Sequence, residues 1–171
     1  MRRENELMRI RPYNEQSDFM QIKNWISDER SHALWCANLL PFPISADSLR
    51  QYLEEHENDR GYVYVDEEDC PVGFFIYVVN EQEKSGFLKF IIVNNKLREQ
   101  GHGTGMLRQF LRIVYDNTDV SSVKLSVFDV NAGARKCYEK AGFTLMENTP
   151  DAFSYQDEMW GRYIMGHELE K

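Results

Sequence analysis

One glycine-rich segment, Arg98 to Gly105, constrains the fold of this chain more than any other stretch. It follows an apolar, β-prone run from Phe87 to Val93, and apolar residues at helical spacing begin at Met106. Glycine lets a backbone approach a ligand closely, and the first amides of a helix have no partner inside that helix. The order of strand, glycine loop and helix therefore predicts a site for a phosphate or pyrophosphate.

Three familiar explanations of such a loop can be compared. A P-loop ends in Gly-Lys-Ser/Thr, and no such ending follows Gly105. A dinucleotide fingerprint would have its third glycine at Met106 and an acidic residue closing its second strand, for which Asp129 is a weak match. A glycine-rich turn without any ligand is the simplest alternative.

The pattern Arg-x-x-Gly-x-Gly between a strand and a helix resembles the pyrophosphate loop of the GNAT superfamily of N-acetyltransferases, which bind acetyl-CoA. A second block, residues 123–143, is similar to the second signature of that family: a strand, Asn131, Ala134-Arg135, and then Tyr-Glu-Lys-x-Gly-Phe from Tyr138. The two motifs stand in family order and at about family spacing. The resemblance covers most of the chain and is weakest over the first sixty residues.

Apolar periodicity and turn residues predict the remaining elements. We expect strands at residues 8–13, 61–65, 72–79, 87–93, 123–128, 143–146 and 159–165, and helices at 15–26, 46–56, about 106–115 and 131–142. The stretch around Trp35 is expected to be irregular, and Thr149 to Asp157 to be a loop. The fold class is α+β in α/β order: one domain, residues 1–171, with a mixed, mostly antiparallel twisted sheet and helices on both faces. The resemblance adds a central strand pair that splays apart.

The net charge and the cysteines of the chain argue against several classes of function. The formal net charge of −8 argues against a nucleic-acid partner, which would require a basic face, and is compatible with a cationic acceptor. Three widely spaced cysteines without a Cys-x-x-Cys pair indicate reduced thiols and no metal site. No signal peptide and no membrane-spanning run are expected, which indicates a cytoplasmic protein.

The resemblance implies a set of donor-binding residues for acetyl-CoA. Arg98 or Lys96 would add charge at the phosphates, although each is also explained as a solvated cation. Asn131 would cap its helix, or also touch CoA, and Arg135 would approach the adenosine phosphate or face solvent. The pyrophosphate would be held by the amides of Gln100, Gly101, His102, Gly103, Thr104 and Gly105, and the pantetheine arm would pair with the strand at Ile91, Ile92 and Val93.

The resemblance also implies catalytic roles. Tyr138 matches the family's general acid for the leaving thiolate; alternatively its ring only packs on the sheet. Full proton transfer from an unperturbed phenol (pKa ~10) to a thiolate (~8.5) is uphill by about 2 kcal/mol, so a hydrogen bond to the developing charge is the safer role. Some family members carry a glutamate on the central strand, but this strand carries Lys89. Asp129, Glu81 and Glu83, or a chain of waters, remain open as the base.

The acceptor is the least defined part of the prediction. Loops commonly carry specificity, so aromatic residues of the two expected loops are candidates for acceptor binding, although aromatics there are as often core: His32, Trp35, Phe42, Phe153 and Tyr155. The stretch from Trp25 to Pro43 resembles the ribosomal-protein N-terminal acetyltransferase branch, which would make the acceptor a protein α-amine. A small amine is equally tenable, and a homodimer is a family expectation.

The leading hypothesis is thus an acetyl-CoA-dependent N-acetyltransferase in which a primary amine attacks directly in a ternary complex. A CoA-binding regulatory or interaction module with the same fold and no turnover is the alternative. A nucleotide-dependent oxidoreductase is disfavoured by the fingerprint mismatch at Met106.

Overall fold

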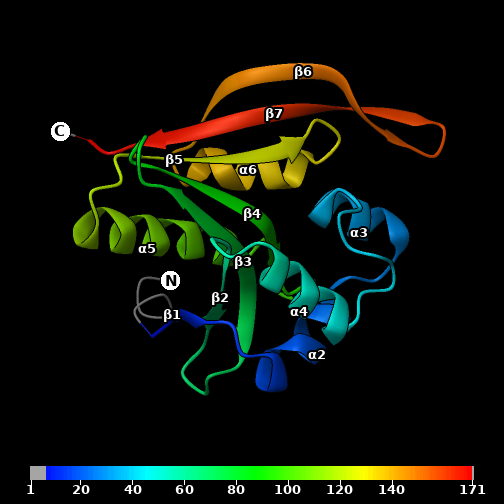
Figure 1. The fold of residues 1–171 in the computed structure, drawn as a ribbon, viewed down its shortest axis with the longest axis horizontal. Coiled ribbons are helices and arrows are strands. Elements are labelled where there is room, and N and C mark those ends of the chain that lie inside the picture. The colour runs from blue at the N-terminus through cyan, green and yellow to red at the C-terminus, as the bar shows by residue number, and fades with distance from the viewer. Residues whose placement is uncertain (1–6, 171) are drawn as a thin grey trace.

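The computed structural model of the chain describes residues 7–170, which fold around one seven-stranded sheet (Figure 1). The strands lie in the order β1-β2-β3-β4-β5-β7-β6, and all neighbours are antiparallel except the parallel central pair, β4 and β5. In chain order the elements are β1 (Arg9–Pro12), α2 (Glu15–Trp25), α3 (Glu29–Cys36), α4 (Ala46–Glu55), β2 (Arg60–Val65), β3 (Pro71–Asn80), β4 (Ser85–Val93), α5 (His102–Asn117), β5 (Ser122–Phe128), α6 (Ala132–Lys140), β6 (Thr144–Tyr155) and β7 (Glu158–Glu168).

The sheet is covered on both faces (Figure 1). The apolar side chains of α5 recur every three to four residues, so one stripe of that helix is buried against the sheet. On that face the core includes Met106, Leu107, Phe110, Tyr138, Phe75, Leu88 and Leu125. On the other face, α2, α3 and α4 contribute Ile22, Trp35 and Leu49, which pack with Val63, Phe74, Ile76, Phe90 and Ile92 of the sheet. The predicted mixed sheet with helices on both faces is confirmed.

Polar caps fix the starts of three helices where the sequence predicts them. The Asn14 side chain accepts hydrogen bonds from the first amides of α2, and Ser45 forms a capping box with Ser48 at α4. The Asn131 side chain accepts from the Ala134 amide at 3.3 Å and so caps α6. Shortly after α6 ends, Gly142 takes φ +101°, a left-handed conformation in which glycine carries no steric cost.

The central strands separate after a short paired segment. β4 and β5 pair from Ser85 opposite Ser122 to Leu88 opposite Leu125, and no further partners follow across this pair. Residues 89–93 of β4 and 126–128 of β5 therefore diverge (Figure 1). The predicted splay is confirmed, and its position on the chain is now defined.

Two expectations about local structure are wrong. The stretch expected to be irregular contains α3, whose first turn is capped by Asp28 through the Ser31 amide at 2.7 Å. The expected loop Thr149 to Asp157 is mostly strand: β6 continues to Tyr155, with a register shift between Thr149 and Phe153 that accommodates Pro150. The outer part of β6 pairs with β7 in a hairpin that is stabilised by cross-strand contacts with Trp160. A local sequence pattern does not reveal such contacts.

Candidate functional site

The glycine loop ends in a helix start whose first amides are available to a ligand. Gly101 is the N-cap of α5, takes φ +83°, and makes no side-chain cap bond. The Gly105 amide donates to the Gly101 carbonyl at 2.9 Å, so the amides of residues 102–104 precede the first intrahelical bond. Together with the helix dipole, these amides can bind a phosphate group.

The first turn of α5 is held against α6 and the end of β4. The Thr104 hydroxyl donates to the Cys137 carbonyl at 3.3 Å. A Cβ at Gly103 would lie 2.8 Å from the Cys137 sulfur and 3.5 Å from a methyl of Val93. Glycine at position 103 is thus required for the packing of α5 on α6. Arg98, Lys96 and Gln100 are exposed on the loop before the helix, where their side chains can reach a phosphate.

A β-bulge interrupts β4 where it leaves β5. Lys89 pairs with Ile76 and Ile92 pairs with Phe74, so Phe90 and Ile91 have no partner on β3. Phe90 takes φ +53°, which a bulky side chain rarely adopts and which costs about 1–3 kcal/mol. Such outliers gather at functional sites, and this one lies at the gap between β4 and β5.

The bulge also changes the side-chain alternation of β4. Leu88 lies in the core under α5, whereas both Lys89 and Phe90 contact Tyr52 of α4 on the opposite face. After the bulge, Ile91 and Val93 return to the α5 side, while Ile92 joins the core under α2, α3 and α4. The three predicted pantetheine contacts therefore lie on the end of β4 that β5 no longer pairs with, and their side chains face both layers of the molecule.

Lys89 takes part in a buried polar cluster that sequence reasoning missed. Its ammonium lies 2.6 Å from the Asp59 carboxylate and 2.7 Å from the Tyr52 hydroxyl. Burial lowers the pKa of Lys89, but Asp59 and Tyr52 outweigh burial and the net pKa is raised. Lys89 is thus a charged structural residue and not a base. A lysine within an apolar strand was the available signal that a buried acid should lie nearby.

The side chain of Tyr138 projects from α6 into the core and is only 6% exposed. Burial raises the pKa of its phenol, with a smaller contribution from Cys137, so the hydroxyl stays protonated well beyond neutral pH. A protonated phenol can donate a hydrogen bond to a leaving thiolate. Complete transfer of its proton is more unfavourable than for an unburied tyrosine.

The other candidates from the second motif have defined neighbours. Asn131 caps α6, as predicted. The Arg135 guanidinium is 3.0 Å from Glu139 and stacks 4.6 Å from the ring centroid of Tyr163, so its charge is already paired. Asp129 is exposed at the end of β5, with a carboxylate oxygen close over Gly161 of β7. Asp129 is therefore held against β7, on the side of β5 that faces away from β4.

Four of the five predicted acceptor residues are packed into cores, whereas Phe42 is 40% exposed and packs with its edge toward His32. His32 is 1% exposed and sits between Asn38 and the Cys36 sulfur, at 3.2 and 3.4 Å, and burial lowers its pKa. The Trp35 indole donates to the Phe90 carbonyl at 2.8 Å. On the hairpin, Phe153 and Tyr155 stack on Trp160 at 5.5 and 4.7 Å. Because of these contacts, the side chains of His32, Trp35, Phe153 and Tyr155 are packed against their neighbours and do not line an open slot.

Helix α3 bridges these two groups across the gap. Ala33 clusters with Phe128 at the end of β5 and with Trp160 of β7. Arg30 pairs with Glu158, and its guanidinium lies 5.1 Å from the Trp160 ring. On its other side α3 contacts β4 through Trp35. Helix α3 and the β6–β7 hairpin, which carry the predicted acceptor residues, therefore meet next to the gap.

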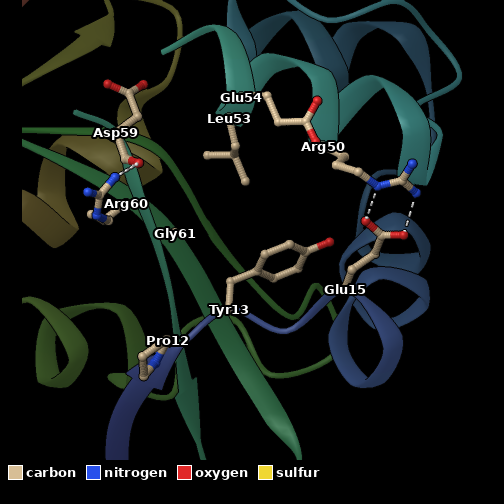
Figure 2. A pocket seen from close by; sticks show the side chains of 9 residues that line it. All are labelled: Pro12, Tyr13, Glu15, Arg50, Leu53, Glu54, Asp59, Arg60 and Gly61. Atoms are coloured by element: carbon tan, nitrogen blue, oxygen red, sulfur yellow. Dashed lines mark hydrogen bonds and ion pairs between the residues drawn. The ribbon is translucent and has the colours of Figure 1, made fainter. Parts of the chain in front are cut away.

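A cavity of about 350 Å³ lies elsewhere, between β1, α2, α4 and the start of β2 (Figure 2). On one wall Glu15 and Arg50 form a bidentate pair, and Tyr13 projects into the space (Figure 2). It contains none of the residues predicted to bind acetyl-CoA or its acceptor; its lining is Pro12, Tyr13, Glu15, Arg50, Leu53, Glu54, Asp59, Arg60 and Gly61. The cavity is therefore lined by no residue of β4, β5 or the glycine loop.

Residues 7–170 contain neither a cluster of metal ligands nor a membrane-spanning helix. No three His, Cys, Asp or Glu side chains in this range gather closely enough to hold a metal ion. No helix in the same range is long and apolar enough to cross a membrane.

Comparisons with known proteins agree with this geometry. The sequence model of the acetyltransferase (GNAT) family matches residues 19–143. A crystal structure of spermidine N-acetyltransferase from Vibrio cholerae in complex with CoA and spermine has a TM-score of 0.80 at 17% identity, over 95% of this chain and 96% of that one. A dodecameric structure of that enzyme in an intermediate state has a TM-score of 0.74 at 16% identity, over 95% and 94% of the two chains. At these identities the structural likeness concerns the fold.

Proposed function

The chain belongs to the acetyltransferase (GNAT) family and is an acetyl-CoA-dependent N-acetyltransferase, and from this premise we propose that its acceptor is a small cationic amine of the polyamine class. The observation that carries the assignment is the gap between β4 and β5 next to the free amides of α5. The polyamine class is supported by the net charge of −8 and by the spermine bound in a structure of the same fold. These neighbours add no support to a ribosomal-protein acceptor.

Acetyl-CoA fits the donor side of the gap. The pyrophosphate would lie on the amides of residues 100–104, with Arg98 or Lys96 adding positive charge. The Gly105 amide, which the sequence also predicts as a contact, is already bonded to the Gly101 carbonyl. The pantetheine amides would pair with β4 at residues 91–93, where β5 no longer offers partners. The thioester would then lie between the diverging strands, close to the bulge at Phe90.

The reaction forms a carbon–nitrogen bond and breaks the carbon–sulfur bond of the thioester and one N–H bond of the amine. The neutral amine nitrogen attacks the thioester carbonyl carbon, and the oxyanion that forms accepts a hydrogen bond from the backbone amide of Ile91. The carbon–sulfur bond then breaks and the thiolate leaves, steadied by the Tyr138 hydroxyl. The proton lost by the amine passes through water to Asp129, the exposed carboxylate that directly follows β5.

Release of free thiol from acetyl-CoA tests this proposal against a panel of polyamines, amino acids, aminoglycosides and peptides with free N-termini. We expect turnover with spermidine or spermine. Turnover with peptides alone would favour a protein α-amine acceptor and overturn the polyamine assignment. If acetyl-CoA raises the melting temperature but no amine supports thiol release, the alternative of a CoA-binding module without turnover gains support.

Assembly and location form part of the same proposal. Nine of the twelve residues of β6 are exposed in sequence from Thr144 to Ala152, and this outer strand can pair with a second copy. We therefore retain a homodimer, which light scattering would distinguish from the 20.2 kDa monomer. A cytoplasmic location is supported by three unpaired thiols: Cys36, Cys70 and Cys137.

A further inference from the structure

We propose that Trp35 is a positioning residue for acetyl transfer, which holds the bulge of β4 in the conformation that presents the Ile91 amide to the thioester carbonyl. The inference rests on the proposed function, in which that amide stabilises the oxyanion. It gives Trp35 a role different from the acceptor contact that the sequence predicts.

The first support is the contact itself. The indole N–H of Trp35 donates to the Phe90 carbonyl at 2.8 Å, and both residues are buried, with 7% and 5% exposure. The two rings also pack together, with centroids 5.3 Å apart. Trp35 therefore holds both the backbone and the side chain of the one residue of β4 that has a left-handed φ.

The second support is the lack of strand partners for Phe90 and Ile91 in the sheet. β4 has no partner on β5 beyond Leu88, and Phe90 and Ile91 have no partner on β3. Neither ladder therefore fixes these two residues, although a buried carbonyl requires a donor. The Lys89 cluster anchors the side chain that precedes the bulge, but not the Phe90 backbone. The indole N–H, which can only donate, provides that anchor.

The third support is the helix that carries Trp35. On the far side of the gap, Ala33 of α3 packs with Phe128 of β5 and Trp160 of β7. Arg30 adds an ion pair with Glu158. Because α3 is attached to the β5 side, its hydrogen bond to Phe90 fixes the bulge relative to the opposite strand. The distance across the gap is therefore set by one helix.

The test compares Trp35→Phe with Trp25→Phe. Trp25 is 3% exposed and belongs to the same core, so both variants lose the same ring volume from that core. We expect kcat to fall about 10- to 100-fold in Trp35→Phe, since small displacements of reacting groups have effects of this order, with the KM for acetyl-CoA changed by less than about threefold. Trp25→Phe should leave kcat within about threefold of wild type.

Amide hydrogen exchange of residues 87–93 provides a readout that does not depend on turnover. We expect faster exchange in Trp35→Phe and unchanged exchange in Trp25→Phe, with similar melting temperatures for the two variants. Equal kcat and equal exchange in both variants would overturn the role of Trp35 while leaving the acetyltransferase assignment intact. If the wild-type enzyme acetylates no amine, the proposed function fails, and the exchange comparison still decides whether Trp35 holds the bulge.

Discussion

The two proposed sides of the gap between β4 and β5, a donor side for acetyl-CoA and an acceptor side for the amine, are built in different ways. The donor side consists of consecutive residues, from the end of β4 through the glycine loop into α5, and it offers backbone amides to its ligand. The acceptor side consists of α3 and the β6–β7 hairpin, which are more than one hundred residues apart and meet through side chains such as Arg30 and Glu158. A backbone site is fixed by local conformation, whereas a site built from distant side chains can change while the donor side stays intact.

Among the variants that test this difference, a substitution at Gly103 should have the largest effect, which is on the affinity for acetyl-CoA. In Gly103→Val the new side chain meets the Cys137 sulfur and Val93, so α5 is displaced from α6, rather than the phosphate being blocked directly. We expect acetyl-CoA affinity to fall at least about 100-fold, measured by calorimetry on the folded protein. The control is Gly133→Ala on α6, whose added Cβ meets no atom within 4 Å and should leave affinity unchanged. Unaltered affinity in Gly103→Val would show that the donor side does not depend on this packing.

Tyr138 should have the next largest effect, and it separates chemistry from binding. Tyr138→Phe should lower kcat by about 100-fold with little change in acetyl-CoA affinity, because the lost hydroxyl acts only on the leaving thiolate. Burial raises the pKa of Tyr138, so the phenol stays protonated where an exposed tyrosine would ionise. The wild-type kcat should therefore not decline near pH 10 through this group. Equal kcat in the variant would reduce Tyr138 to a packing residue.

The smallest effect is expected on the acceptor side. Arg30 and Glu158 are each 45% exposed, so solvent screens their ion pair and it contributes little to stability. Arg30→Ala should nevertheless loosen α3 from the hairpin and raise the KM for the amine a few-fold, without changing the KM for acetyl-CoA. Arg50→Ala is the matched control, because it breaks a comparable exposed pair with Glu15 at the separate cavity (Figure 2). If both variants change the amine KM alike, α3 has no special part in acceptor binding.

The donor side could be predicted from the sequence because its features are local. The glycine spacing, the apolar stripe of α5 and the Asn131 cap each lie within a few residues, and all three occur where expected. The splay of β4 from β5 was expected from the resemblance, and the end of their pairing at Leu88 agrees with it.

The acceptor side could not be predicted because its stability comes from contacts between distant residues. Helix α3 was missed because the two prolines that follow it suggested irregular structure, although Asp28 was an available cap. The outer part of β6 was predicted as a loop because Pro150 lies in the middle of the strand, where a bulge accommodates it and Trp160 packs against the residues beyond. The bulge at Phe90 has no local signal at all, since nothing in the sequence of β4 indicates a left-handed residue.

Amide hydrogen exchange of the wild-type protein, with and without acetyl-CoA, tests most directly whether the donor binds in the gap. We predict slower exchange for residues 89–93 of β4 and residues 100–105 of the glycine loop when acetyl-CoA is present, and no such change with NAD. Protection confined to the cavity lined by Tyr13 and Glu15, or protection by NAD at the glycine loop, would contradict the assignment of the gap as the acetyl-CoA site.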